Sequence, residues 1–253
     1  MDKTNDIVVG AGRIYFSLKG HGGERYLGDT PGFTIGISSE QTDVYSSDDP
    51  IAEKIVSVLR NVERTATITC QDVSLDNLAI FMLGDVTSLT QTASEVADEE
   101  AMVKKGEWYQ LGSGVGVRDV SSVSLQAAKV KADTYINLVA DTDYTLDSEN
   151  GRVFMLTDVV KFNNPIKFTY TPKAATYAQV QTSDDRTIEG ALRFLSDNTK
   201  GTNRDFFAPN VVIRPEGQIE LKSRDNPVQL TFNVEFLKEG SDEAIYVTNR
   251  KAN

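Results

Sequence analysis

The chain has very few of the residues that carry chemistry in most enzymes. Its 253 residues include one cysteine, one histidine and one tryptophan. One cysteine excludes an intrachain disulfide framework and fits synthesis in a reducing cytosol, and one Cys with one His cannot make a zinc site. Nucleophilic catalysis needs a base beside the nucleophile, but His21 lies in a glycine turn far from any candidate. We therefore expect no enzyme activity, no bound metal and no cofactor.

Long hydrophobic runs and basic runs are also missing. No apolar stretch approaches the ~20 residues that a membrane helix needs, so we expect no membrane insertion. Acidic residues outnumber basic ones by 37 to 26, which gives a net charge of -11. A protein that binds nucleic acid usually carries a basic patch, and this sequence contains no run of Lys or Arg. The acidic excess serves solubility or makes a surface that repels polyanions.

Strand-like alternation is the strongest positive signal. From Val62 to Asp72 and again from Val228 to Leu237, polar residues alternate with apolar ones. A strand of this kind packs its apolar side on a core and gives the other side to water. Here the polar side is uniform, built from hydroxyl, amide and carboxylate groups, and it lacks the apolar lining of a small-ligand pocket. Such a hydrophilic surface suits a molecule that must move along it without binding.

A long segment connects the first of these strands to an earlier one at Phe33–Ile37. Residues 44–61 contain Ser46–Pro50 and then several apolar side chains, and we expect a loop far longer than the ~2–5 residues of a typical hairpin. Its apolar residues would lie in water on a monomer, which favours an interface with another molecule. A short helix packed on its own domain is the alternative.

One short helix is predicted at Ser74–Leu83. Ser74 is a suitable N-cap, and Gly84 stands where a left-handed C-terminal residue is wanted. Apolar residues cover so much of the helix that we expect it to be nearly enclosed, partly by another subunit.

The middle of the chain reads as a separate small β unit. The alternation of apolar and polar residues fades over residues 88–105, which we expect to be a solvated linker. The clearest hairpin in the chain follows, with Asn150-Gly151 between the alternating runs Asp143–Asp147 and Arg152–Leu156. We predict a discontinuous main domain, 1–105 and 179–253, and an inserted domain, 106–178. The insertion resembles an immunoglobulin-like domain, although it lacks the Cys-Trp-Cys pattern.

Two blocks of strands and turns resemble the major tail tube proteins of long-tailed, siphophage-like bacteriophages. The first block runs from GFTIGISSE (Gly32–Glu40) through the acidic loop to ATITC (Ala66–Cys70) and the helix that ends before Gly84. The second comprises Leu192–Asn198, Phe206–Val211, Ile213–Gly217 and Leu230–Phe236. None of these is a catalytic signature, so the resemblance concerns architecture.

The resemblance implies a mainly β fold of two packed antiparallel sheets, a sandwich or barrel, with one flanking short helix. Six copies would close into a ring whose inner sheets join as a continuous β-barrel, and stacked rings would form a hollow conduit for DNA during ejection. The chain would be made in the bacterial host cytoplasm and end up in the tail of the virion. Its partners would be copies of itself, the tape measure protein and other tail proteins, with DNA passing through unbound. The inserted domain would lie on the outer surface.

The resemblance also assigns candidate surfaces. The residues expected to face the lumen are Ser38, Glu40, Thr42, Glu63, Thr65, Thr67, Thr69, Thr231, Asn233 and Glu235. The residues expected in a ring-to-ring contact loop are Val44, Tyr45, Asp48, Asp49, Ile51, Ile55, Val58 and Leu59. The helix residues expected at a subunit interface are Leu75, Leu78 and Met82. Two other functions stay open: a tube subunit of a secretion system, and a β-rich adhesin or binding module whose inserted unit does the binding.

Overall fold

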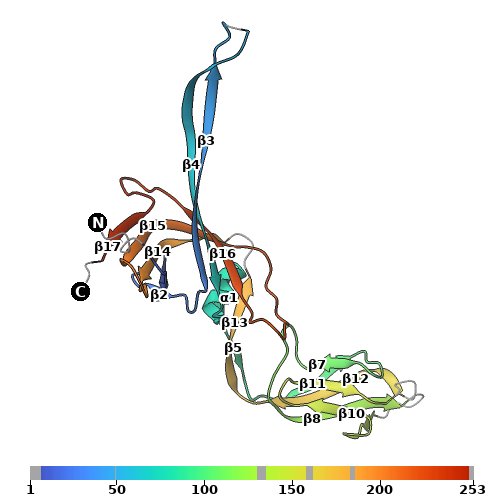
Figure 1. The fold of residues 1–253 in the computed structure, drawn as a ribbon. Coiled ribbons are helices and arrows are strands. Elements are labelled where there is room, and N and C mark those ends of the chain that lie inside the picture. Colours follow the sequence, from blue (N-terminus) through green and yellow to red (C-terminus); the bar gives the residue numbers. More distant parts are fainter. Residues whose placement is uncertain (1–6, 49, 130–134, 158–161, 183–185, 251–253) are drawn as a thin grey trace. The chain divides into compact units, whose positions relative to one another are not determined.

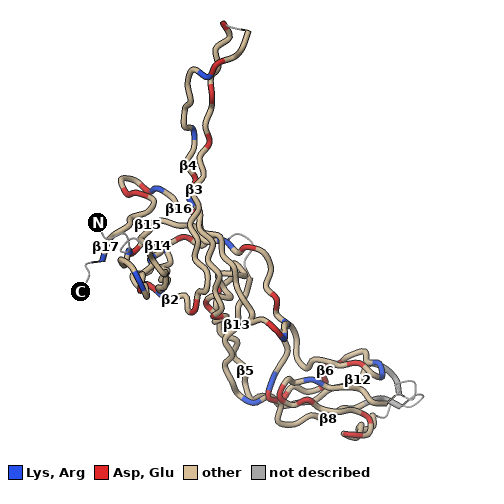
Figure 2. The backbone as a smooth tube through the Cα atoms, in the orientation of Figure 1, with Lys and Arg blue, Asp and Glu red and all other residues tan. Residues whose placement is uncertain are grey.

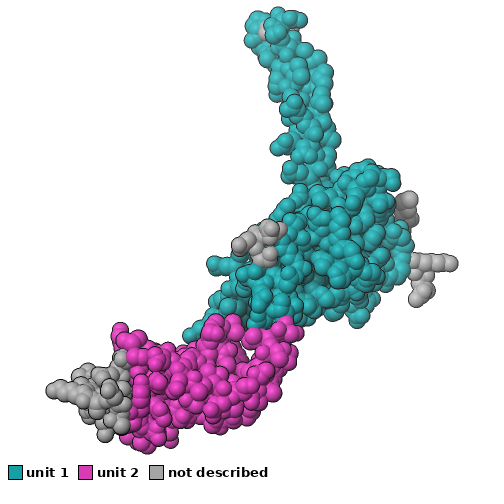
Figure 3. All heavy atoms as spheres, turned by 180° about the vertical axis from the view of Figure 1, so that it is seen from behind, with its two compact units in different colours: residues 1–87, 179–253 teal, residues 88–178 magenta. Residues whose placement is uncertain are grey.

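The computed structural model describes residues 7–48, 50–129, 135–157, 162–182 and 186–250. The described chain is mainly β with one short helix, as the alternation predicts (Figure 1). It divides into two compact units, coloured separately in Figure 3. Unit 1 comprises Met1–Thr87 and Gln179–Asn253, and unit 2 comprises Ser88–Ala178.

Unit 1 is built on one eight-stranded antiparallel sheet with the order β2-β1-β14-β15-β16-β4-β3, and β17 pairs with β15 beside this path. Its strands are β1 (Gly12–Leu18), β2 (Arg25–Tyr26), β3 (Gly32–Tyr45), β4 (Lys54–Cys70), β14 (Ile188–Ser196), β15 (Arg204–Pro215), β16 (Leu230–Phe236) and β17 (Tyr246–Asn249).

This sheet curls around a single core. Phe33 on β3 and Phe194 on β14 have ring centroids 5.3 Å apart, although β15, β16 and β4 lie between those strands in the sheet order. The core side carries fully buried residues such as Ile68 and Phe232. We predicted two packed sheets. In unit 1, the β3 end of one curled sheet packs across the core against β14 instead, and the strands between them form a continuous hydrogen-bonded series.

The helix α1 (Leu75–Phe81) covers part of this core. Its Phe81 ring packs edge-on against Phe232, with centroids 6.1 Å apart. Ser74 is the N-cap, as predicted, and its hydroxyl accepts a hydrogen bond from the Asn77 backbone N–H. The predicted C-terminus is wrong, because Leu83 and not Gly84 has the positive φ, at 51°. Gly84 begins the next strand, where a Cβ would clash with the Gln181 carbonyl oxygen.

The segment at residues 44–61 is not the long loop that we predicted. β3 and β4 pair from Gly32 opposite Thr69 to Tyr45 opposite Lys54, so only residues 46–53 connect them. Val56, Ser57 and Val58 continue the alternation of apolar and polar residues. The hydrogen-bonded pairing of β3 with β4 therefore continues beyond the rest of the large sheet. The result is a long hairpin that projects from unit 1 (Figure 1). We call its projecting part, residues Ser38–Asn61, the arm.

Unit 2 has its own sheets and its own core. A four-stranded sheet has the order β6-β12-β8-β9, and a three-stranded sheet has the order β10-β11-β7. Their strands are β6 (Val96–Ala101), β7 (Trp108–Gln110), β8 (Val120–Lys129), β9 (Tyr135–Asn137), β10 (Tyr144–Asp147), β11 (Arg152–Met155) and β12 (Phe162–Pro172). The predicted hairpin is confirmed, since β10 and β11 pair in antiparallel fashion. Leu125, Val153, Met155 and Ile166 are fully buried in the core.

The predicted linker over residues 88–105 is wrong. β6 pairs with β12 along Val96–Ala101, so the inserted unit begins at Ser88 and not at residue 106. The acidic run that suggested a linker lies on this edge strand, where Asp98 pairs with Lys167 at 3.7 Å and Glu99 accepts a hydrogen bond from the Tyr170 hydroxyl. The chain passes between the units through β5 (Gly84–Gln91) and β13 (Ala175–Thr182), which pair as a two-stranded sheet.

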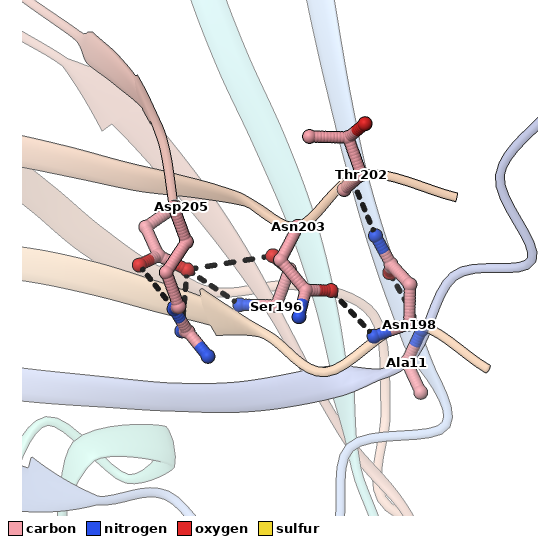
Figure 4. Close-up of polar contacts among 7 residues, drawn as sticks. Ala11, Ser196, Asn198, Thr202, Asn203 and Asp205 are labelled. Atoms are coloured by element: carbon pink, nitrogen blue, oxygen red, sulfur yellow. Dashed lines mark hydrogen bonds and ion pairs between the residues drawn. The ribbon is translucent and has the colours of Figure 1, made fainter. Parts of the chain in front are cut away.

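A polar network fastens β17 to the rest of unit 1 (Figure 4). The Asp205 carboxylate accepts hydrogen bonds from the Ser196 backbone N–H at 3.0 Å and from Arg250 at 2.7 Å. Asn198 extends the network to Thr202 and Asn203, which lie in the connection between β14 and β15. This turn and the C-terminal strand are therefore held by side-chain contacts as well as by sheet pairing.

Candidate functional site

A hydrophilic surface covers the side of the large sheet that faces away from the core. Ala66, Ile68 and Cys70 on β4 are buried, and the threonines that alternate with them are half-buried on the opposite side. β16 continues the same surface in register, so that Thr231 lies opposite Thr69, Asn233 opposite Thr67 and Glu235 opposite Thr65. We call this surface the threonine face. Its members on these two strands are Glu63, Thr65, Thr67, Thr69, Thr231, Asn233 and Glu235.

The threonine face extends onto β3 and β15. Ser38 and Glu40 on β3 are exposed and pair with Glu63 and Asn61. Thr42 is the exception among the predicted residues, because it lies beyond an irregularity in the ladder and opposite the apolar Val58.

Two further members of the threonine face were not among the predicted residues. Thr34 lies opposite Thr67 and has the same alternation phase as Ser38, so the sequence contained its signal. Arg214 lies opposite Asn233 and forms an ion pair with Glu235 at 2.6 Å. The sequence contained no signal for Arg214, because its place on this face depends on the pairing of β15 with β16 in the folded chain. The ion pair offsets one of the acidic charges on the face.

Beyond its base, the arm projects away from the other described residues of unit 1 (Figure 3). Every described residue from Ser38 to Tyr45 and from Lys54 to Asn61 is exposed. The uncovered apolar side chains include Ile51, which is 78% exposed, and Ile55, which is 63% exposed. The full set of large exposed apolar residues here is Val44, Tyr45, Ile51, Ile55, Val56, Val58 and Leu59. An exposed apolar surface of this kind marks an interaction site.

Polar side-chain contacts join the two strands of the arm to each other. The Ser57 hydroxyl donates to Asp43 at 2.7 Å and lies 2.9 Å from the Gln41 side-chain oxygen. Lys54 pairs with Asp43 at 2.7 Å. Hydrogen bonds from Lys54 and Ser57 hold the pKa of the Asp43 carboxyl below its usual range. The arm is thus an ordered hairpin near its end as well as at its base. Asp48 is exposed at the tip, and the predicted contact residue Asp49 lies outside the described residues.

The helix residues predicted for a subunit interface lie mostly against their own chain. Leu78 and Met82 are half-buried and pack on the core of unit 1, while Leu75 is 41% exposed. The most buried helix residue is Asn77, whose amide nitrogen donates to the carbonyl oxygens of Leu27 and Asp72 at 2.8 Å each. Its amide oxygen accepts a hydrogen bond from Arg25 at 2.8 Å. A buried asparagine with its hydrogen bonds made stabilises one arrangement of the helix and the neighbouring loops.

In the part of the chain that the structure describes, no group of three or more His, Cys, Asp or Glu residues could hold a metal ion. Burial raises the pKa of the Cys70 thiol, which disfavours the thiolate that a nucleophile needs. Among these described residues, no helix is both long and apolar enough to span a membrane.

Comparison with known proteins gives a family without an assigned activity. The family described as "Protein of unknown function UCP028589" matches residues 7–211, and the chain belongs to that family. The matched range includes the arm, the helix, unit 2, the β14 strand and the first part of the β15 strand of unit 1. No protein of the curated collection matches the chain.

Proposed function

We propose that this chain is a structural subunit of a bacteriophage tail tube, in which hexameric rings stack into a hollow conduit for DNA. The observation that carries the proposal is the combination of two surfaces on one unit. The threonine face offers a broad hydrophilic wall on one side of a single sheet, and the arm offers uncovered apolar side chains beyond that sheet. In the proposal, the first surface lines the channel and the second contacts a neighbouring copy.

The chemistry of the threonine face suits a channel for a polyanion. Hydroxyl and amide side chains dominate it, and its carboxylates are Glu40, Glu63 and Glu235, of which Glu235 is paired with Arg214. Duplex DNA carries one negative charge per ~1.7 Å of its axis, so basic side chains would retain it. A neutral to acidic wall lets DNA pass without adhering.

Self-assembly follows from the position of the arm. A surface on one copy that fits a different surface on the next makes a head-to-tail contact, and such contacts build filaments when they do not close. Ring closure through the sheets would also protect the edge strands that would otherwise invite aggregation. In the same proposal the inserted, immunoglobulin-like unit decorates the outside of the tube, and the tape measure protein and other tail proteins are its partners.

The test is the assembly state of the purified full chain. Sedimentation and electron microscopy over a range of concentrations should show six-membered rings and hollow filaments. A chain that stays monomeric at high concentration, even when tail particles are added as seeds, would contradict the proposal. Rings without DNA passage would favour the secretion-tube alternative, and a monomer that binds cells through unit 2 would favour the adhesin alternative.

A further inference from the structure

Unit 1 has an apolar groove beside the base of the arm. The groove has a volume of about 640 Å³ and is lined by three residues of β3 and by aromatic and aliphatic residues of other strands. The main apolar lining residues are Phe33, Ile35, Ile37, Phe194, Phe206 and Val247. Arg64 is the single charged residue in the lining. Ile37 is 68% exposed and Val247 is 54% exposed, so much of this apolar surface faces solvent.

Residues of two edge strands line the groove together with residues of other segments. Within the described chain, β3 ends the series of strands in the large sheet and pairs only with β4, while β17 pairs only with β15. The rings of Phe194 and Phe206, with centroids 6.1 Å apart, also line the groove. An apolar cleft bordered by open strand edges suits an extended, apolar segment of protein.

The arm of a second copy has the matching properties. It presents Ile55, Val58 and Leu59 to solvent, and each of these side chains is more than half exposed. Its end carries the exposed acidic residues Asp48 and Glu53, whose charge is opposite to that of Arg64 in the groove. Acidic positions are coloured red along the distal arm in Figure 2. The arm points away from its own unit in Figure 1, so it is available to a neighbour. At about 3.4 Å per residue, the eight residues from Ser38 to Tyr45 extend the arm by roughly 27 Å.

We propose that the groove of one copy receives the distal arm of a second copy. This inference rests on the proposed function, because it names the receiving surface for the arm within the assembly. Each copy carries both surfaces, so the contact is head-to-tail and can repeat indefinitely. Apolar side chains on the arm fill the groove, and the acidic end of the arm lies near Arg64.

Site-directed cross-linking tests the contact. The double variant Ile55→Cys with Val247→Cys places one thiol on the arm and one in the groove, and the native Cys70 is buried. Assembled protein, mixed from isotopically light and heavy copies, is treated with a short bismaleimide, and the cross-linked peptides are analysed by mass spectrometry. We expect mixed-isotope peptides that join residues 55 and 247. The matched control replaces Val247→Cys by Leu221→Cys, which is 73% exposed and lies outside the groove, and should give at least tenfold less product.

A second variant covers the case in which the cysteine pair is poorly placed. Val247→Glu introduces a negative charge into the apolar groove, where it would also repel the acidic end of the arm, and should raise the concentration needed for assembly at least tenfold, while Leu221→Glu should not. The thermal unfolding of both variants as monomers should match that of the original chain, since both positions are exposed.

The outcomes separate this inference from the proposed function. Suppose that tubes form, that the control cross-links as efficiently as the groove pair, and that Val247→Glu assembles normally. The groove is then not the receiving site, while the tube function stands. Cross-links joining residues 55 and 247 of the same copy, or a small molecule found in the groove by native mass spectrometry, would also overturn the inference. If the unmodified chain never assembles, both proposals fail.

Discussion

Phe33 and Phe194 are in contact across the core of unit 1, with ring centroids 5.3 Å apart, although three strands lie between them in the sheet. The contact exists only because the sheet curls. It therefore reports on the curvature that turns the threonine face outward and leaves the groove beside β3.

A double-mutant cycle on this pair should give a coupling free energy of about 0.5–1.5 kcal/mol, the range found for aromatic contacts. The measurement is chemical denaturation of Phe33→Ala, Phe194→Ala and the double variant at concentrations where the chain is monomeric. Combining Phe33→Ala with Trp108→Ala in unit 2 is the control and should show no coupling. Equal coupling in both pairs would mean that the two rings do not interact specifically.

Asn77→Ala should cost at least about 2 kcal/mol of unfolding free energy. The change removes the amide partner of the Arg25 guanidinium and leaves the Leu27 and Asp72 carbonyl groups with only the weak Cys70 thiol donor. A buried polar group that loses its partner typically costs ~1–3 kcal/mol. Asp76→Ala on the exposed side of the same helix is the control, with an expected cost of under about 1 kcal/mol. If both variants lose the same stability, the buried amide network does not hold the helix in place.

The Asp205 carboxylate should make the stability of unit 1 depend on pH. Burial alone would raise its pKa, but hydrogen bonds and charge from Arg250 and hydrogen bonds from Ser196 together hold the pKa below its usual value. The folded-state pKa is thus lower than the unfolded one, so the stabilisation is complete above the unfolded value of about 3.9 and is lost as the pH falls through the lowered value.

This dependence can be measured by comparing the original chain with Asp205→Asn in urea at pH 7, 5 and 3. The variant should be less stable at pH 7 and 5 by the same amount, and the difference should shrink at pH 3. Asp225→Asn in an exposed connection is the matched control and should show little difference at any pH. A difference for Asp205 that stays constant down to pH 3 would show that its charge does not contribute.

Replacing Thr65, Thr67 and Thr69 by lysine should impede DNA passage while leaving the fold nearly intact. The side chains lie away from the core, so unfolding free energy should change by no more than about 1 kcal/mol. The added cations would bind phosphate groups of DNA. Particles carrying the variant should release their genome more slowly, whereas the triple serine variant should behave like the original. Unchanged release rates with lysine would place this surface away from the DNA path.

The sequence predicted local features well. Alternation in Thr65–Cys70 and Leu230–Phe236 correctly separated the buried side chains from those that face outward. The Ser74 cap and the hairpin around Gly151 were also correct, because each depends on a few neighbouring residues.

Features that depend on distant partners were missed. The turn-forming residues Ser46–Pro50 suggested a long loop over residues 44–61. In the structure, the β3–β4 pairing continues through Val44 opposite Val56, so most of this segment belongs to the hairpin arm. The acidic run at Asp98 suggested a linker, but it pairs with β12 some seventy residues later. The groove could not be predicted either, because β3 and β17, which are far apart in the sequence, contribute lining residues to it only in the folded sheet.

An electron cryomicroscopy map of the assembled full chain, at a resolution that places side chains, tests the central claim most directly. The account predicts a central channel lined by Thr65, Thr67, Thr69, Thr231 and Asn233 from every copy in the ring. A map in which these residues point to the outside of the particle, or lie beneath another protein layer with no channel beside them, would contradict it.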